Sequence, residues 1–132
     1  MEITVVQEQG RVPVTILQVA GNTDSASAAA FEKTVLDVID GGARYLVLDL
    51  NKVPYMSSAG LRVLQEAFTK LRALAGSESK EDTYRQIADG SYKSPYLKII
   101  NPNKDVLEVL KMSGFDMLVS IEKDLKTAVT SF

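Results

Sequence analysis

The residues best suited to chemistry are two neighbouring hydroxyls, Ser57 and Ser58, with Gly60 close behind them. They separate a short apolar run of strand length, residues 44–50, from an amphipathic helical pattern that begins at Leu61. A serine at a helix start can cap the helix, because its hydroxyl accepts a hydrogen bond from a first-turn amide. A hydroxyl displayed there is also a natural place to carry a phosphate. Gly60 adds almost no bulk, so we expect that another molecule can approach the backbone closely at this point.

Other chemistries are restricted by what the composition lacks. The chain has no His and no Cys, which excludes a Ser-His-Asp triad, a disulfide, a thiolate metal site and the usual His-ligated metal site. We therefore expect no metal and no cofactor. A Ser-Lys dyad stays open, with Lys52 or Lys70 as the base, although the spacing does not specifically favour it.

The totals are those of an ordinary globular protein. The 132 residues are 45% hydrophobic and 24% charged, with a net charge of −2 and no dense basic stretch, which argues against a nucleic-acid or anionic-membrane surface. There is no apolar run of about 18 residues and no signal peptide, so we expect no membrane span and a cytoplasmic protein. The length predicts one domain, residues 1–132, with a polar insertion at about 76–95.

The order of elements predicts an α/β fold. After an initial hairpin, helices alternate with strands, so right-handed crossovers should build a mixed, mostly parallel sheet of about five strands with four helices. The expected strands are residues 2–9, 12–20, 44–50, 96–101 and 118–121. The expected helices run from a cap at Asp24 or Ser25 to about residue 40, from a cap at Ser57 or Ser58 through a stripe at residues 61–75, from Pro102 to Ser113, and over residues 122–131.

The insertion is polar and mixed in charge, so it offers little to a core. We expect residues 76–94 to form a long surface loop with one helical turn near residues 81–88. Tyr84, Tyr92 and Tyr96 are expected to anchor this loop rather than to line a ligand site.

The motif Met56–Leu64 (MSSAGLRVL), at the junction of the third strand and second helix, resembles the corresponding segment of STAS domains. Gly21–Asp24 resembles the Gly-x-x-Asp motif of that family, and Asn101-Pro102 and Ser113–Phe115 fall where the family has similar residues. The resemblance implies a STAS-like (SpoIIAA-like) fold over most of the chain. The family pattern has an aspartate where this chain has Ser57, which leaves the register of the two serines ambiguous by one.

The resemblance also implies a function, that of a bacterial anti-sigma factor antagonist. Such a protein is not an enzyme; unphosphorylated, it binds and sequesters a serine-kinase anti-sigma factor, and a serine phosphatase resets it. Ser58 takes the phosphoacceptor position, with Ser57 as the alternative. The partner-binding residues implied are Asp24, Ser57, Ser58, Gly60, Leu61, Arg62 and Gln65. An alternative is a scaffold subunit of a signalling or lipid-transport complex that is never phosphorylated.

Overall fold

Five strands and five α-helices make up the part of the chain that the structure describes. The computed structural model describes residues 1–76 and 80–132, with side chains from residue 84 onward in the second range. Along the chain lie strands β1 (Glu2–Gln9) and β2 (Pro13–Ala20), helix α1 (Ala28–Asp40), strand β3 (Leu46–Lys52), helices α2 (Ser58–Ala75) and α3 (Lys80–Asp89), strand β4 (Leu97–Ile100), helix α4 (Lys104–Met112), a 3₁₀ turn η1 (Phe115–Met117), strand β5 (Ser120–Glu122) and helix α5 (Leu125–Thr130).

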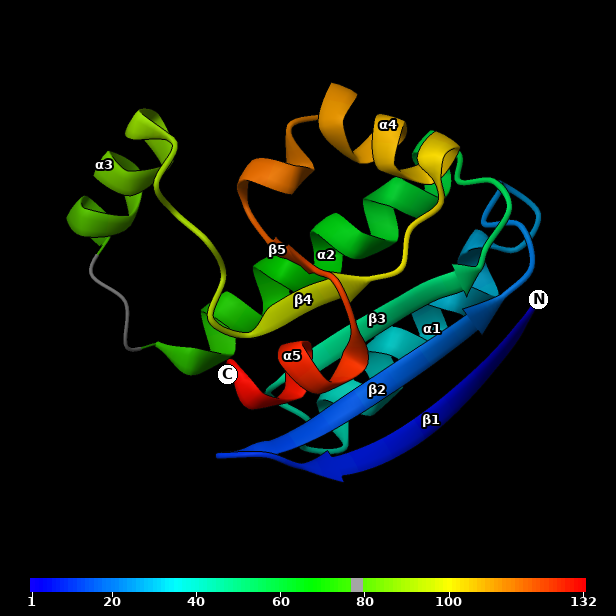
Figure 1. Cartoon of the computed structure of the whole chain (residues 1–132), viewed down its shortest axis with the longest axis horizontal. Coiled ribbons are helices and arrows are strands. Elements are labelled where there is room, and N and C mark those ends of the chain that lie inside the picture. The colour runs from blue at the N-terminus through cyan, green and yellow to red at the C-terminus, as the bar shows by residue number, and fades with distance from the viewer. Residues whose placement is uncertain (77–79) are drawn as a thin grey trace.

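The strands form one sheet in the order β1-β2-β3-β4-β5. Strand β1 is antiparallel to β2, and every later neighbour pair is parallel. Because each crossover helix returns the chain to the next position in the sheet, the carboxyl ends of β2, β3 and β4 meet along one edge (Figure 1). The predicted mixed, mostly parallel sheet is confirmed.

Apolar side chains fill both faces of the sheet, but unequally. The larger core lies where α1 and α2 pack, and it includes Phe31, Val35 and Leu64 against Leu48. A smaller core lies on the opposite face, under α5 (Figure 1). The α2 stripe predicted from its three- and four-residue spacing is buried as expected, from Leu61 through Leu71.

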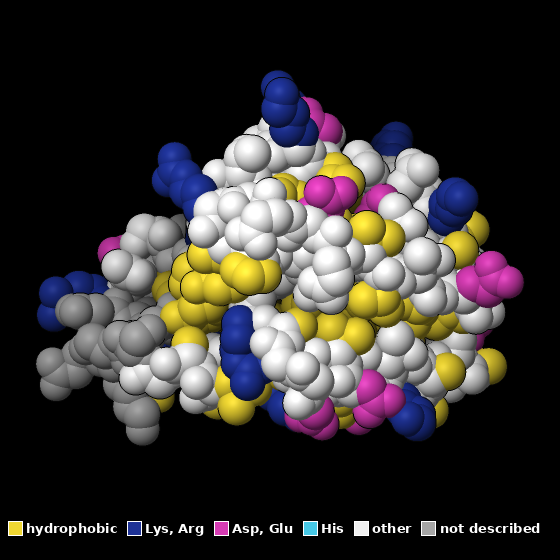
Figure 2. All heavy atoms as spheres, turned by 90° about the horizontal axis from the view of Figure 1, so that it is seen from below, with side chains coloured by type: hydrophobic (Ala, Val, Ile, Leu, Met, Phe, Trp, Pro, Cys, Tyr) yellow, Lys and Arg dark blue, Asp and Glu magenta, His cyan; other side chains and the backbone are white. Residues whose placement is uncertain are grey.

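The outer side of β1 forms an open edge of the sheet. Figure 2 views the molecule from this side and shows apolar side chains in a broken band between charged ones. Val5 on β1 is among the exposed large hydrophobic residues.

The structure differs from the sequence prediction mainly in the insertion. Residues 80–89 form the complete helix α3, not one turn in a loop, so the described part of the chain has five α-helices where four were expected. Figure 1 shows α3 standing away from the sheet. Tyr92 and Tyr96 are buried anchors as predicted, whereas Tyr84 is 64% exposed and anchors nothing, because α3 does not pack that side chain on the body.

The start of α4 also differs. Pro102 was expected in the first helical turn, but the helix begins at Lys104 and Asn103 is its N-cap. Asn101, directly before the proline, has a positive φ of 56°, a conformation that asparagine tolerates better than most residues. This conformation turns the chain sharply out of β4.

Candidate functional site

Three loops meet at the carboxyl ends of β2, β3 and β4. The backbone N–H of Thr23, after β2, donates to the Tyr55 carbonyl at 3.0 Å, and the Ser57 N–H donates to the Thr23 carbonyl at 2.7 Å. From the third loop, the side-chain amide of Asn103 donates to the carbonyls of Val53 and Pro54. The segment between β3 and α2 is thus held from both sides, just beyond the carboxyl ends of the parallel strands.

The two serines occupy different environments. Ser57 is the N-cap of α2: it is half-buried, and its Oγ accepts a hydrogen bond from the Gly60 N–H at 3.3 Å. Ser58 is the first residue of the helix; it is exposed, and its hydroxyl makes no hydrogen bond with any described residue. Of the two serines, Ser58 is therefore the more exposed.

The start of α2 favours a negative charge beside Ser58. The first amides of a helix have no intrahelical acceptor, and the macrodipole places a partial positive charge there. No acidic side chain occupies the first turn of α2, so this positive end is not offset within the helix. A phosphate on Ser58 would lie within reach of that unpaired charge.

Gly60 serves the chain's own packing. A Cβ added there would lie 2.5 Å from Thr23 Oγ1 and 2.8 Å from the Thr23 carbonyl oxygen. The expectation that another molecule approaches the backbone at this point is therefore wrong for that side of Gly60, because Thr23 occupies it. Leu61 likewise belongs to the main core, with 9% of its surface exposed.

Asp24 has a local structural role beside the serines. Its Oδ1 accepts hydrogen bonds from the N–H groups of Ala26 and Ser27 and from the Ser27 hydroxyl, so the carboxylate caps the turn that leads into α1. It remains half-exposed, on the loop that contacts Ser57 through Thr23.

Arg62 and Gln65 follow Ser58 on the outer side of α2. Both are exposed, and both line a shallow groove between α1 and α2 together with Leu36 and Lys70. The structure thus brings all the residues predicted for partner binding to one end of α2, some on the surface and some beneath it.

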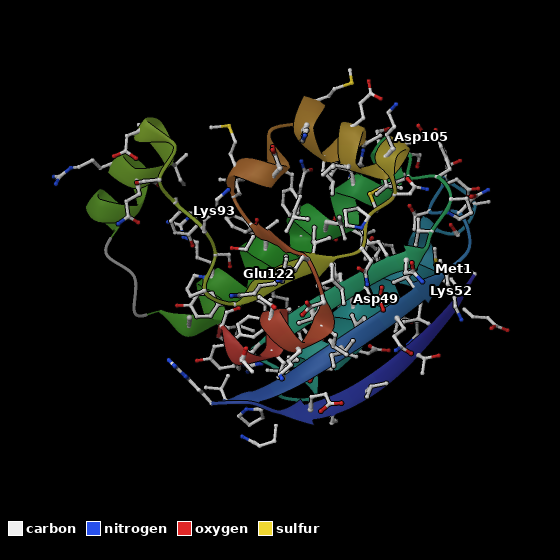
Figure 3. The ribbon with its side chains drawn as sticks, in the orientation of Figure 1. Met1, Asp49, Lys52, Lys93, Asp105 and Glu122 are labelled. Carbon is white, nitrogen blue, oxygen red and sulfur yellow. The ribbon has the colours of Figure 1, made fainter. Side chains whose placement is uncertain are left out.

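The Ser-Lys alternative finds little support. Lys70 lies twelve positions after Ser58 on the same helix, about 18 Å at 1.5 Å per residue, and its ammonium pairs with Asp40 at 2.6 Å. Lys52 lines a polar hollow together with Glu2 and Asp49. Lys52 and Asp49 are labelled in Figure 3. Within the described ranges, no hydrogen bond joins either lysine to Ser58.

Neither a metal site nor a membrane span is found in what the structure describes. Among the side chains that the structure describes, residues 1–76 and 84–132, no group of three or more Asp or Glu residues is arranged to hold a metal ion. The described helices are all too short or too polar to cross a lipid bilayer.

Sequence reasoning missed three residues of this site. Thr23 is buried, and its hydrogen bonds join the loop after β2 to the loop after β3. Asn103 connects the loop after β4 to that same β3–α2 loop. Tyr55 lies in the β3–α2 loop between the contacts of Asn103 and those of Thr23, and it is 52% exposed. Pro54-Tyr55 between a strand and a helix is a detectable signal for an exposed aromatic residue. The contacts of Thr23 and Asn103 link positions 32 and 49 residues apart, which no local pattern reveals.

Comparisons with known proteins agree with this architecture. BtrV of Bordetella bronchiseptica is 29% identical over 112 residues, covering 85% of this chain and 80% of BtrV. The anti-sigma-F factor antagonist RsfB of Mycobacterium tuberculosis is 32% identical over 69 residues, covering 52% of this chain and 54% of RsfB. The phosphorylated form of the Bacillus cell fate determinant SpoIIAA matches in structure with a TM-score of 0.61 at 14% identity, covering 93% of each chain, which confirms the predicted SpoIIAA-like fold.

The family assignment follows from a further match. The model of the STAS domain matches residues 4–77, which run from β1 through α2 and include all the serine-bearing junction. The chain belongs to the STAS domain family.

Proposed function

We propose that this chain is an anti-sigma factor antagonist that binds a serine-kinase anti-sigma factor in its unphosphorylated state. The kinase would phosphorylate Ser58 and so end the binding, and a serine phosphatase would restore it. The exposed hydroxyl of Ser58 at the start of α2 is the observation that carries the proposal, because Ser57 beside it is engaged in capping. The likeness to RsfB, an anti-sigma-F factor antagonist by name, supports it.

Phosphorylation at this position should act on the partner rather than on the fold. It adds about −1.5 to −2 charges. The helix N-terminus favours negative charge by about 0.3–1 kcal/mol, so α2 should persist. Like charges brought together across an interface cost several kcal/mol, and a ~3–4 kcal/mol penalty weakens binding by a few hundredfold. The protein is then a binding module and a kinase substrate in the cytoplasm, not an enzyme.

The contact surface proposed here is the exposed rim of the site. It comprises Ser58, Arg62 and Gln65 on α2, with the half-exposed Asp24 and Ser57 beside them. Gly60 and Leu61 would contribute from beneath, by fixing α2 against Thr23 and the core.

The proposal is tested by incubating the chain with ATP and a serine-kinase anti-sigma factor, and mapping the phosphate by mass spectrometry. We expect modification of wild type at Ser58 and none of Ser58→Ala. Ser58→Asn serves as a second unreactive variant of similar polarity. Phosphate on a residue other than Ser57 or Ser58 would rule out the assigned site.

The replacement of the family's aspartate by Ser57 favours one other function, that of an unphosphorylated scaffold subunit in a signalling or lipid-transport complex. Ser58→Asp separates the two functions. In a phosphorylation switch it should weaken binding of the partner by up to about a few hundredfold. In a scaffold whose contact lies elsewhere, it should change binding little.

A further inference from the structure

The side chain of Asn103 is bonded at both of its ends. Its Oδ1 accepts from the Val106 N–H at 2.7 Å and caps α4, while its Nδ2 donates to the carbonyls of Val53 at 3.3 Å and Pro54 at 3.1 Å. One amide therefore ties the start of α4 to the segment that leads into the serines. An asparagine suits this role because it carries an acceptor and two donors on one planar group.

The backbone before Asn103 is held in a less common conformation. Asn101 has a positive φ of 56°, and Pro102 follows it directly. Residues in such sparsely populated conformations persist where the surrounding structure holds them, and they gather at functional sites. Here the turn delivers Asn103 to the β3–α2 loop.

The two anchors of that loop are complementary. Asn103 holds its first half, at Val53 and Pro54, and Thr23 holds its second half, through Tyr55 and Ser57. Pro54 has no N–H and a fixed φ, so the backbone between the anchors has little freedom. What the loop presents outward is the half-exposed Tyr55 and, just beyond it, the exposed Ser58.

We propose that Asn103 is a positioning residue for the switch: by fixing the Val53-Pro54 backbone, it sets the presentation of Tyr55 and Ser58 to the partner kinase. Asn103 does not touch the reacting hydroxyl. Its loss should therefore weaken docking of the kinase rather than slow phosphate transfer in the docked complex. This inference rests on the proposed function, but its structural half can be measured without a kinase.

The test variant is Asn103→Asp in the full chain. Aspartate caps helices as well as asparagine does, so α4 keeps its N-cap, but the ionised side chain has no donor for the two carbonyls. Asn103→Ser, which also caps but carries no added charge, separates the lost donors from repulsion. The matched control is Asp124→Asn, a cap exchange at α5, where Oδ1 accepts from the Thr127 N–H at 2.7 Å far from the loop in sequence.

The first measurement is amide hydrogen exchange of Thr23 and Ser57, whose N–H groups bond across the loop. We expect about tenfold faster exchange in both Asn103 variants, consistent with the net loss of one or two hydrogen bonds, and no change in Asp124→Asn. If the two Asn103 variants are folded and their Thr23 and Ser57 amides exchange at the wild-type rate, the proposal is overturned.

The second measurement is phosphorylation of Ser58 by the serine-kinase anti-sigma factor. We expect KM to rise about tenfold in the Asn103 variants while kcat stays within about twofold. Faster exchange with unchanged KM would show that Asn103 only stabilises the loop, and it would overturn the proposed role of Asn103 in the switch. If the kinase fails to modify even the wild-type chain, the proposed function fails, and the exchange result alone decides whether Asn103 holds the loop.

Discussion

Replacing Ser58 by aspartate should strengthen the fold while it weakens the partner complex. Helix α2 has Arg72 in its last turn but no acidic side chain in its first, so the partial positive charge at its N-terminus is not offset. A carboxylate at the first helical position gains about 0.3–1 kcal/mol from the macrodipole. For a domain of this size, about 3–5 °C accompany each kcal/mol, so Tm should rise by roughly 1–5 °C.

The assay is thermal unfolding at low and high salt beside a binding titration with the anti-sigma factor. Ser58→Asn is the matched control, because it has nearly the same shape without the charge. The rise in Tm of Ser58→Asp over Ser58→Asn should shrink at about 1 M salt, where the Debye length falls to about 3 Å. Binding by Ser58→Asp should be weaker by up to a few hundredfold.

The result that would refute this reasoning is a fall in Tm for Ser58→Asp that Ser58→Asn does not share. It would mean that negative charge at this position disturbs the fold itself. Loss of binding could then no longer be assigned to repulsion of the partner.

Two further predictions concern the packing and the C-terminal helix. Gly60→Ala should lower the free energy of unfolding by about 1–3 kcal/mol in chemical denaturation, since its new methyl group overlaps Thr23. Gly41→Ala, whose nearest contact is 3.3 Å from the Asp37 carbonyl oxygen, should cost less. Equal midpoints for the two variants would contradict the close packing at Gly60. The hydrogen bond from Thr127 lowers the pKa of Asp124, so its contribution to α5 is present above the ordinary aspartate pKa and lost as pH falls through the lowered value. The protection of the α5 amides, meaning the intrinsic exchange rate at each pH divided by the observed rate, should therefore fall in acid for wild type but not for Asp124→Asn. Identical acid profiles of protection would show that the Asp124 cap has no effect.

The sequence predicted the order of the helices and strands along the chain, because the type of each element depends on local periodicity. The α2 stripe, the cap at Ser57 and the apolar β3 are patterns within one element, and the structure confirms them. The helix α3 was missed because its residues are polar and gain little from burial, so the window resembled a loop.

The tertiary structure alone decided which serine is displayed and what surrounds it. Ser57 and Ser58 are indistinguishable by residue type. Thr23, after β2, and Asn103, in the β4–α4 turn, hold the segment that leads into α2. That placement turns the Ser57 hydroxyl inward as a cap and leaves Ser58 exposed. The same is true of Gly60, which appeared to be an open approach until Thr23 was found against it. Local patterns report what a residue can do, whereas contacts between distant segments fix which of its options is realised, because loop closure brings those segments together only in the folded chain.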